Sequence, residues 1–130
     1  MEEYDPLKAP DPQQWLKMDE TERLTLVEKY HEKMNVELED PRMHAIMHVI
    51  VENQLAENIP DVVEAMERLQ FQKLNRHNAI HAIATVLADF FWELIRRGKS
   101  YSDMPAEEAY LKELRKLTKR SWYRKIRKAR

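Results

Sequence analysis

The chain contains a single glycine, Gly98, among its 130 residues, and this scarcity restricts the fold more than any other feature. Tight turns between strands usually need glycine, because several of them require positive φ angles that other residues adopt at a steric cost. Of all 130 residues, 43% are hydrophobic and 35% are charged. The sequence therefore predicts an all-α protein, a compact bundle of about four core helices followed by a basic C-terminal helix.

Helix signals divide the chain into three parts. Residues 1–18 contain three prolines, which favour an extended lead-in. Residues 19–98 are expected to form the helical bundle domain, with helix starts capped by Asp19, Asp40 and Asn75 and the last helix ending at Gly98. Residues 99–130 are expected to form one further helix. The expected bundle helices lie at about 19–35, 41–58, within 59–74, and 76–97.

Several classes of protein are disfavoured by what the chain lacks. It has no cysteine, which excludes disulfides and thiolate metal sites and fits a reducing compartment. Its N-terminal segment lacks the basic and apolar regions of a signal peptide, and no uninterrupted apolar run approaches the roughly 18 residues of a membrane span. We therefore expect a cytoplasmic protein with no membrane partner.

Two expected helices each carry a histidine pair with the spacing His-x-x-x-His. The stretch HAIMHVIVE places His44, His48 and Glu52 in one sector of its helix, and HNAIH contributes His77 and His81. Imidazoles four residues apart stack on one side of a helix and can bind one ion, for which Zn or Fe is favoured over Ni. The fifth histidine, His31, is expected at the surface or at the rim.

The two histidine helices are separated by one helix, so an up-and-down bundle would make them parallel and bring their N-terminal turns to one level. We therefore predict a mononuclear metal site formed by His44, His48, His77 and His81. Glu52 is expected either to bind the metal or to orient a ligand. Two alternatives stay open, namely structural histidines that hydrogen-bond to backbone or acidic groups, and a functional pocket without metal.

The sequence does not decide whether the protein is an enzyme. In the zinc-protease motif His-Glu-x-x-His, the glutamate beside the first ligand is the general base, but Ala45 and Asn78 stand in that place here. Protease activity is therefore disfavoured. Neither the substrate nor the reaction can be read from the residues.

Three stretches resemble a small bacterial family known only as a domain of unknown function, number 1841. They are WLKMDETERLTLVEKYH, RMHAIMHVIVENQLA and LNRHNAIHAIATVLADFFW, within residues 13 to 97. The resemblance implies a compact helical domain and brings no established activity, substrate or cofactor. Some similar sequences have an acidic residue where Asn78 stands, which puts a base role at that position in doubt. The resemblance also implies that five positions belong to the family pattern: His44, His48, Glu52, His77 and His81.

The formal charge is unevenly distributed. Residues 1–111 carry 12 Lys and Arg against 22 Asp and Glu, whereas residues 112–130, the basic tail, carry ten against one. Such a helix can bind phosphate groups while its aromatic rings stack on bases, so RNA or an acidic protein is the alternative partner, and a homodimer is a further option. A solvated helix, or one folded back on the acidic body, has the same composition. The candidate contacts in the tail are Arg120, Trp122, Arg124, Lys125 and Arg127.

Overall fold

The computed structural model describes residues 1–97 and 106–128. This part of the chain contains helices and no strand, which confirms the all-α prediction. Gly98 and the expected cap at residues 102–105 lie outside the described residues. The seven helices are α1 (Pro12–Lys17), α2 (Glu20–Lys33), α3 (Pro41–Ala56), α4 (Pro60–Phe71), α5 (Arg76–Arg97), α6 (Ala106–Arg115) and α7 (Lys119–Lys128).

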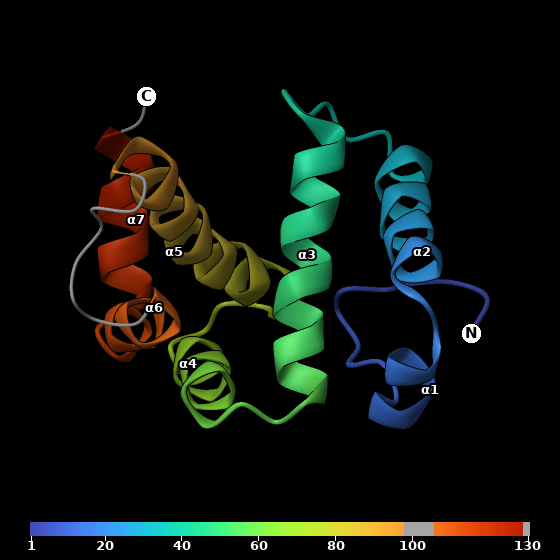
Figure 1. The fold of residues 1–130 in the computed structure, drawn as a ribbon, viewed down its shortest axis with the longest axis horizontal. Helices are drawn as coiled ribbons and strands as arrows, with labels where there is room; N and C mark the ends of the chain where they lie inside the picture. Colours follow the sequence, from blue (N-terminus) through green and yellow to red (C-terminus); the bar gives the residue numbers. More distant parts are fainter. Residues whose placement is uncertain (98–105, 129–130) are drawn as a thin grey trace.

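Helix α3 stands in the middle of the molecule (Figure 1), with α1 and α2 on one side and α4 to α7 on the other. It separates two hydrophobic clusters. Its Met47 and Val51 belong to the larger cluster, formed with α4 to α7, while its Ala45 and Val49 belong to a smaller one formed with α1, α2 and the N-terminal segment. A helix buried from both sides must be apolar almost all round, as α3 is.

The expected caps are present. Side-chain oxygens of Asp19, Asp40 and Asn75 accept hydrogen bonds from the backbone N–H three residues later, at 2.8, 3.1 and 2.8 Å respectively. Pro41 occupies the first position of α3, where its missing N–H leaves no hydrogen bond unmade. These local signals place the helix starts that the sequence predicted.

The expectation of an extended lead-in over residues 1–18 is wrong in part. Asp11 caps a short helix, α1, whose first residue is Pro12. A proline blocks a helix from its interior, but at the first position it helps to start one. The N-terminal segment is also part of the core, because Tyr4, Pro6 and Trp15 are buried.

The single C-terminal helix expected over residues 99–130 is two helices in the described part. The backbone turns between α6 and α7, where Thr118 Oγ1 accepts from Ser121 N and Ser121 Oγ accepts from Thr118 N, both at 3.0 Å. The guanidinium of Arg68 binds the carbonyls of Leu114 and Leu117 at the end of α6. Reciprocal capping of this kind starts a new helix, so the basic tail bends and packs against α4 and α5.

The C-terminal ends of α2, α3 and α4 are closed without glycine. The residues in the left-handed conformation after α2, α3 and α4 are Asn35, Asn58 and Lys73, with φ of 54°, 60° and 77°. In each case the next residue donates its N–H back to the last turn of the helix. Asparagine tolerates this conformation better than other residues with a Cβ, whereas lysine does not.

Replacing Lys73 with glycine is therefore expected to raise the free energy of unfolding by about 0.5–1 kcal/mol, because relief of the Cβ clash exceeds the added entropy of the unfolded chain. Chemical denaturation would measure the change. The comparison is Lys112→Gly, in the exposed interior of α6, which should lower the free energy of unfolding by about 1 kcal/mol. A loss of stability in Lys73→Gly would contradict the argument.

Helix α5 meets the length and composition of a membrane span over Arg76–Arg96. Charged residues at both ends of this helix, and Asp89 and Glu93 within it, interrupt its apolar runs, so the sequence did not indicate a span there. A core helix meets the same test, and α5 places Ile80, Ile83 and Leu87 in the larger cluster. By itself, this property says nothing about a membrane.

Candidate metal centre

Four histidines from three helices converge at one point. One ring nitrogen each from His31, His44, His48 and His81 lies within 4.8 Å of the others. The nitrogens also face each other in pairs, because His44 Nε2 lies 3.1 Å from His31 Nε2 and His48 Nε2 lies 3.1 Å from His81 Nε2. A tetrahedral ion with bonds of about 2.0–2.1 Å would hold its ligand nitrogens roughly 3.3 Å apart.

His31 was expected at the surface or rim, and this expectation is wrong. Its side chain is buried, with 6% of its surface exposed, and it supplies one of the four nitrogens. The sequence held a signal, because His31 follows the buried Val27 by four residues and therefore shares its helix face. Because α2 packs against α3, the face of α2 that carries His31 meets the face of α3 that carries His44 and His48.

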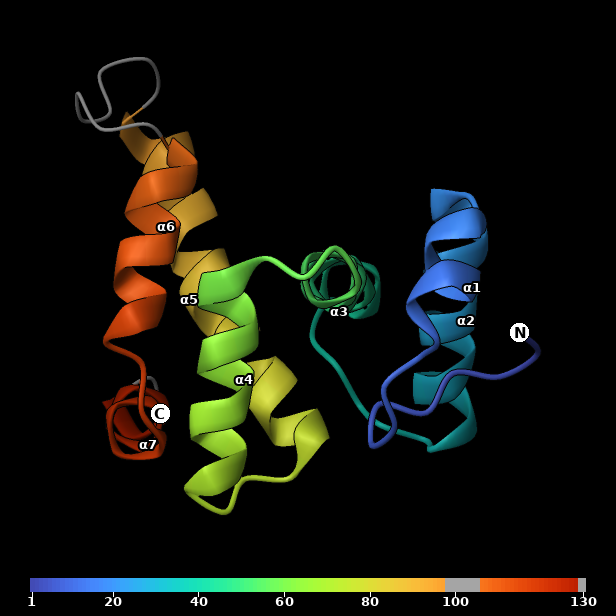
Figure 2. The same cartoon turned by 90° about the horizontal axis from the view of Figure 1, so that it is seen from below.

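The histidines converge in a different way from the one expected. Figure 2 views α3 along its axis and α5 from the side, so the two helices cross instead of running parallel. The first turns of α5 pack beside α3, which brings His81 against His48. The two pairs lie close together as predicted, although the bundle geometry used to derive this is wrong, and three of their four residues belong to the group of four nitrogens.

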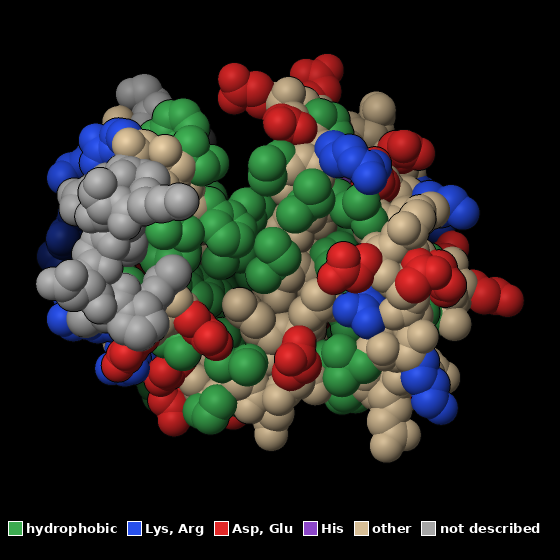
Figure 3. All heavy atoms as spheres, viewed as in Figure 1, with side chains coloured by type: hydrophobic (Ala, Val, Ile, Leu, Met, Phe, Trp, Pro, Cys, Tyr) green, Lys and Arg blue, Asp and Glu red, His purple; other side chains and the backbone are tan. Residues whose placement is uncertain are grey.

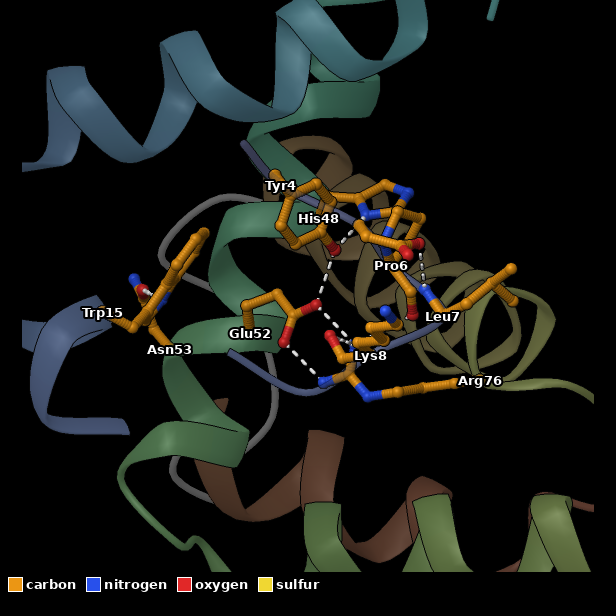
Figure 4. A network of polar contacts seen from close by, with 10 residues as sticks. Tyr4, Pro6, Leu7, Lys8, Trp15, His48, Glu52, Asn53 and Arg76 are labelled. Atoms are coloured by element: carbon orange, nitrogen blue, oxygen red, sulfur yellow. Dashed lines mark hydrogen bonds and ion pairs between the residues drawn. The ribbon is translucent and has the colours of Figure 1, made fainter. Parts of the chain in front are cut away.

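The hydrogen bonds of His48 fix which ring nitrogen faces the cluster. The Tyr4 hydroxyl donates to Glu52 Oε2 at 2.5 Å and lies 3.1 Å from His48 Nδ1 (Figure 4). A carboxylate only accepts, so the one phenolic proton is used there and the phenolic oxygen accepts from His48 Nδ1–H. The proton of a neutral imidazole is then on Nδ1. His48 Nε2 therefore presents a lone pair to His81.

His31 is held in the same tautomer by the backbone. Its Nδ1 lies 2.8 Å from the carbonyl oxygen of Val27, which can only accept a hydrogen bond. His31 Nε2 therefore presents a lone pair to His44. Metal-binding histidines usually donate their second ring N–H to a carbonyl or to a carboxylate network, and both arrangements occur here.

Glu52 lies beside the cluster and outside the group of four. Its carboxylate pairs with Arg76 through bonds of 2.7 and 2.9 Å and accepts from Tyr4, and both partners of this ion pair are buried. Arg76 also donates to the carbonyl of Pro6, which ties the N-terminal segment to α3 and α5 (Figure 4). Of the two roles expected for Glu52, the geometry favours orientation of a ligand, acting on His48 through Tyr4.

Sequence reasoning did not identify Tyr4 and Arg76. They lie 48 and 24 residues from Glu52 in the chain. Neither belongs to a recognisable motif, and only the folding of the N-terminal segment against α3 and α5 brings them to Glu52. No local pattern in the sequence could have indicated this contact.

His77 is close to the group but not part of it. Its ring centroid lies 4.3 Å from that of His81 and 5.2 Å from that of His48. Its Nε2 is buried and has no hydrogen-bond partner within the described residues. A buried polar atom without a partner costs about 1–3 kcal/mol, so this nitrogen calls for an explanation.

Burial keeps four of the imidazoles neutral. Together with the neighbouring histidines, it lowers the pKa of His44 and of His77 to about 4 and that of His81 to about 3. The pKa of His48 is also lowered strongly, again mainly by burial. Neutral imidazole is the form that binds metals, so His44, His48 and His81, which belong to the group of four nitrogens, are ready to bind near pH 7, as is His77.

These shifts predict that the metal-free protein loses stability as the pH falls from 7 to 5. The pKa of an unfolded histidine is about 6.5, so below that pH the unfolded chain binds more protons than the folded one. The stabilisation is complete above about pH 6.5 and declines toward pH 4, so the melting temperature should drop over this range. His77→Gln should show a shallower drop. A melting temperature that rises from pH 7 to pH 5 would contradict the prediction.

Of the five tail residues proposed to contact nucleic acid, the aromatic one does not reach the surface. Trp122 is 8% exposed and its indole N–H lies 3.3 Å from Thr85 Oγ1, so it is a core residue and cannot stack on bases. Lys125 forms an ion pair with Asp89. The side chains of Arg120, Arg124 and Arg127 are exposed.

Residues 10–116 match the family described as a domain of unknown function, DUF1841. The chain belongs to this family. The DUF1841 match extends beyond residues 13 to 97, includes all five histidines and ends before α7. Tyr4 lies outside it. No curated protein and no solved structure matches the chain.

Proposed function

We propose that this protein binds one transition-metal ion, zinc or iron in preference to nickel, through His31, His44, His48 and His81. The observation that carries the proposal is the orientation of His31 and His48. Their Nδ1 atoms are engaged as donors elsewhere, so both Nε2 lone pairs point into a group of four nitrogens within 4.8 Å. Each lone pair faces a second imidazole nitrogen at 3.1 Å, so either a metal ion or the Nε2 protons of His44 and His81 must occupy the space between the rings.

The donor set narrows the choice of ion. Four neutral imidazoles suit zinc, iron, nickel and copper, and the group contains no thiolate or carboxylate that would favour another class. A divalent ion there would bring two positive charges into a half-buried site. The Glu52 carboxylate supports the site through Tyr4 and His48, although Arg76 neutralises it in part.

His77 has a natural role in this proposal. Its buried Nε2 lies beside the group without a partner among the described residues, and a water molecule or hydroxide on the metal would provide one. Its spacing from His81 also allows it to enter the coordination sphere as a fifth ligand. Both roles agree with the sequence prediction that His77 belongs to the site.

Elemental analysis tests the proposal. Untagged protein, purified without chelator or metal resin, is expected to contain about one equivalent of Zn or Fe, and the double variant His48→Gln, His81→Gln should contain none. The control is Gln70→Asn, an exposed change on α4, which should keep the metal. Folded protein that contains no metal, and gains no stability from added Zn²⁺ or Fe²⁺, would make the histidines structural.

We further propose a weaker second candidate, the binding of RNA by α7. The observation that favours it is that Arg120, Arg124 and Arg127 are exposed and form no ion pair within residues 1–97 and 106–128. Deletion of residues 112–130 would not test this idea, because it removes Leu114, Leu117 and Trp122 from the core. Surface substitutions are required instead.

Reversing the charge of these three arginines to glutamate is expected to weaken binding of single-stranded RNA. The plot of log K for RNA binding against log salt concentration should become less steep, with a slope smaller in magnitude by about two. Each lost phosphate contact removes roughly 0.7 from that slope. Fluorescence anisotropy at several salt concentrations would measure the slope, and metal content should not change. Equal RNA binding by the variant and the parent would overturn this second candidate.

A further inference from the structure

A cavity of about 330 Å³ opens onto the histidine group. Three of the four proposed ligands line it, namely His44, His48 and His81, while His31 does not. An ion held by the four nitrogens would therefore have one side turned toward this cavity. A ligand entering here would reach the metal between these three imidazoles.

The cavity continues into a longer apolar groove between α3 and α5. The groove has a volume of about 660 Å³ and shares Met43, Met47 and Ala88 with the cavity. Hydrophobic side chains fill the hollow between these two helices (Figure 3). Trp92 and Ile95, which also line the groove, are 69% and 74% exposed. A continuous exposed apolar surface of this kind commonly marks a binding site.

The charges around the cavity select the type of ligand. Glu39 and Asp40 line its edge, Asp89 lines the groove, and no lysine or arginine among residues 1–97 and 106–128 lines either of them. Asp89 is paired with Lys125, so the carboxylates that have no ionic partner in the described part of the chain lie at the end next to the histidines. These carboxylates offset part of the positive charge that a divalent ion would bring, so they favour a neutral ligand over a carboxylate or a phosphate.

We propose that this cavity and groove bind an elongated apolar molecule whose nitrogen head coordinates the metal between His44, His48 and His81. The inference rests on the proposed metal site and adds the class of its ligand. The small side chains Ala84 and Ala88 leave room for the apolar chain along α5, and the two methionines adapt to its shape. Cavities of 300–1,000 Å³ with apolar walls and a few polar groups typically take small molecules.

The experiment uses the full chain loaded with Co²⁺, whose visible bands report the coordination of the ion, and 1-hexylimidazole as the probe. At pH 8 the probe should change the Co²⁺ spectrum and bind at least about tenfold more tightly than 1-methylimidazole, because only the former has a chain to bury. Hexanoate should bind at least about tenfold more weakly than 1-hexylimidazole. Metal content is measured on the same samples.

Ala88→Trp should fill the groove and weaken 1-hexylimidazole binding at least about tenfold while the Co²⁺ content stays the same. Ala88 is exposed, so the larger side chain does not disturb the core. The control is Gln70→Trp, at an exposed position of α4, which should bind the probe like the parent.

The outcomes separate this inference from the metal proposal. Protein that binds Co²⁺ but gives no spectral change with 1-hexylimidazole overturns the inference and leaves the metal site standing. Equal binding of 1-hexylimidazole by metal-free protein, or tighter binding of hexanoate, also overturns it. Protein that binds no Co²⁺ overturns the metal proposal and this inference together.

Discussion

Replacing Arg76 with methionine is expected to lower the free energy of unfolding by about 3–5 kcal/mol. The guanidinium of Arg76 makes two bonds to Glu52, and both side chains are buried. Methionine has a similar length but carries no charge, so the Glu52 carboxylate would stay buried without its ionic partner. The carbonyl of Pro6 would lose a donor as well. Urea denaturation followed by circular dichroism measures the change.

Arg115→Met is the matched control. Arg115 lies 3.3 Å from Asp61 in an exposed pair, for which the expected loss is under about 1 kcal/mol. The double variant Glu52→Leu, Arg76→Met should regain part of the loss, because it removes both charges from the interior. A loss in Arg76→Met no larger than that in Arg115→Met would mean that the buried pair does not hold the N-terminal segment in place.

The second large effect concerns Tyr4. Tyr4→Phe is expected to weaken Zn²⁺ binding by about 10–100-fold, because it removes the oxygen that accepts from His48 Nδ1 and fixes its tautomer. His81→Gln, which removes a proposed ligand, should weaken binding by at least about 100-fold. Isothermal titration with Zn²⁺ at pH 7 measures both affinities.

Tyr30→Phe is the control for Tyr4→Phe, since it removes the same atom from a tyrosine whose contacts with the histidines, among the described residues, are made through its ring. The Zn²⁺ affinity of Tyr30→Phe should stay within about twofold of that of the parent. This is a small change compared with the loss of about 10–100-fold expected for Tyr4→Phe. Equal affinities for Tyr4→Phe and the parent would show that the Glu52, Tyr4 and His48 chain does not support the site. The metal site itself would then rest on the result for His81→Gln.

Some features of this protein are decided by local sequence. Helix starts at Asp19, Asp40 and Asn75 follow from caps that act within three residues, and the scarcity of glycine agrees with the all-α fold. The spacing of four residues places His44 beside His48 on any α-helix, whatever the rest of the chain does. The predicted metal site began from this local geometry.

Two features also depend on short-range interactions but differ from the sequence prediction, namely helix α1 and the division of the C-terminal region into α6 and α7. Pro12 was taken to block a helix, but with Asp11 as its cap it starts α1. The residues 112–130 were treated as one basic helix, yet Thr118 and Ser121 begin a second helix, and apolar residues between the basic ones reach the core. Charge dominated the composition there, while burial of Leu114, Leu117 and Trp122 determined the packing.

Tertiary structure alone decided which residues form the site. The sequence placed histidine pairs on two helices, but the crossing of α3 and α5 brought His81 into the group and left His77 beside it. The packing of α2 on α3 added His31, and the burial of the N-terminal segment joined Tyr4 and Arg76 to Glu52. Helix signals act over three or four residues, whereas these contacts join positions 13 to 48 residues apart, and only the packing of apolar faces fixes them.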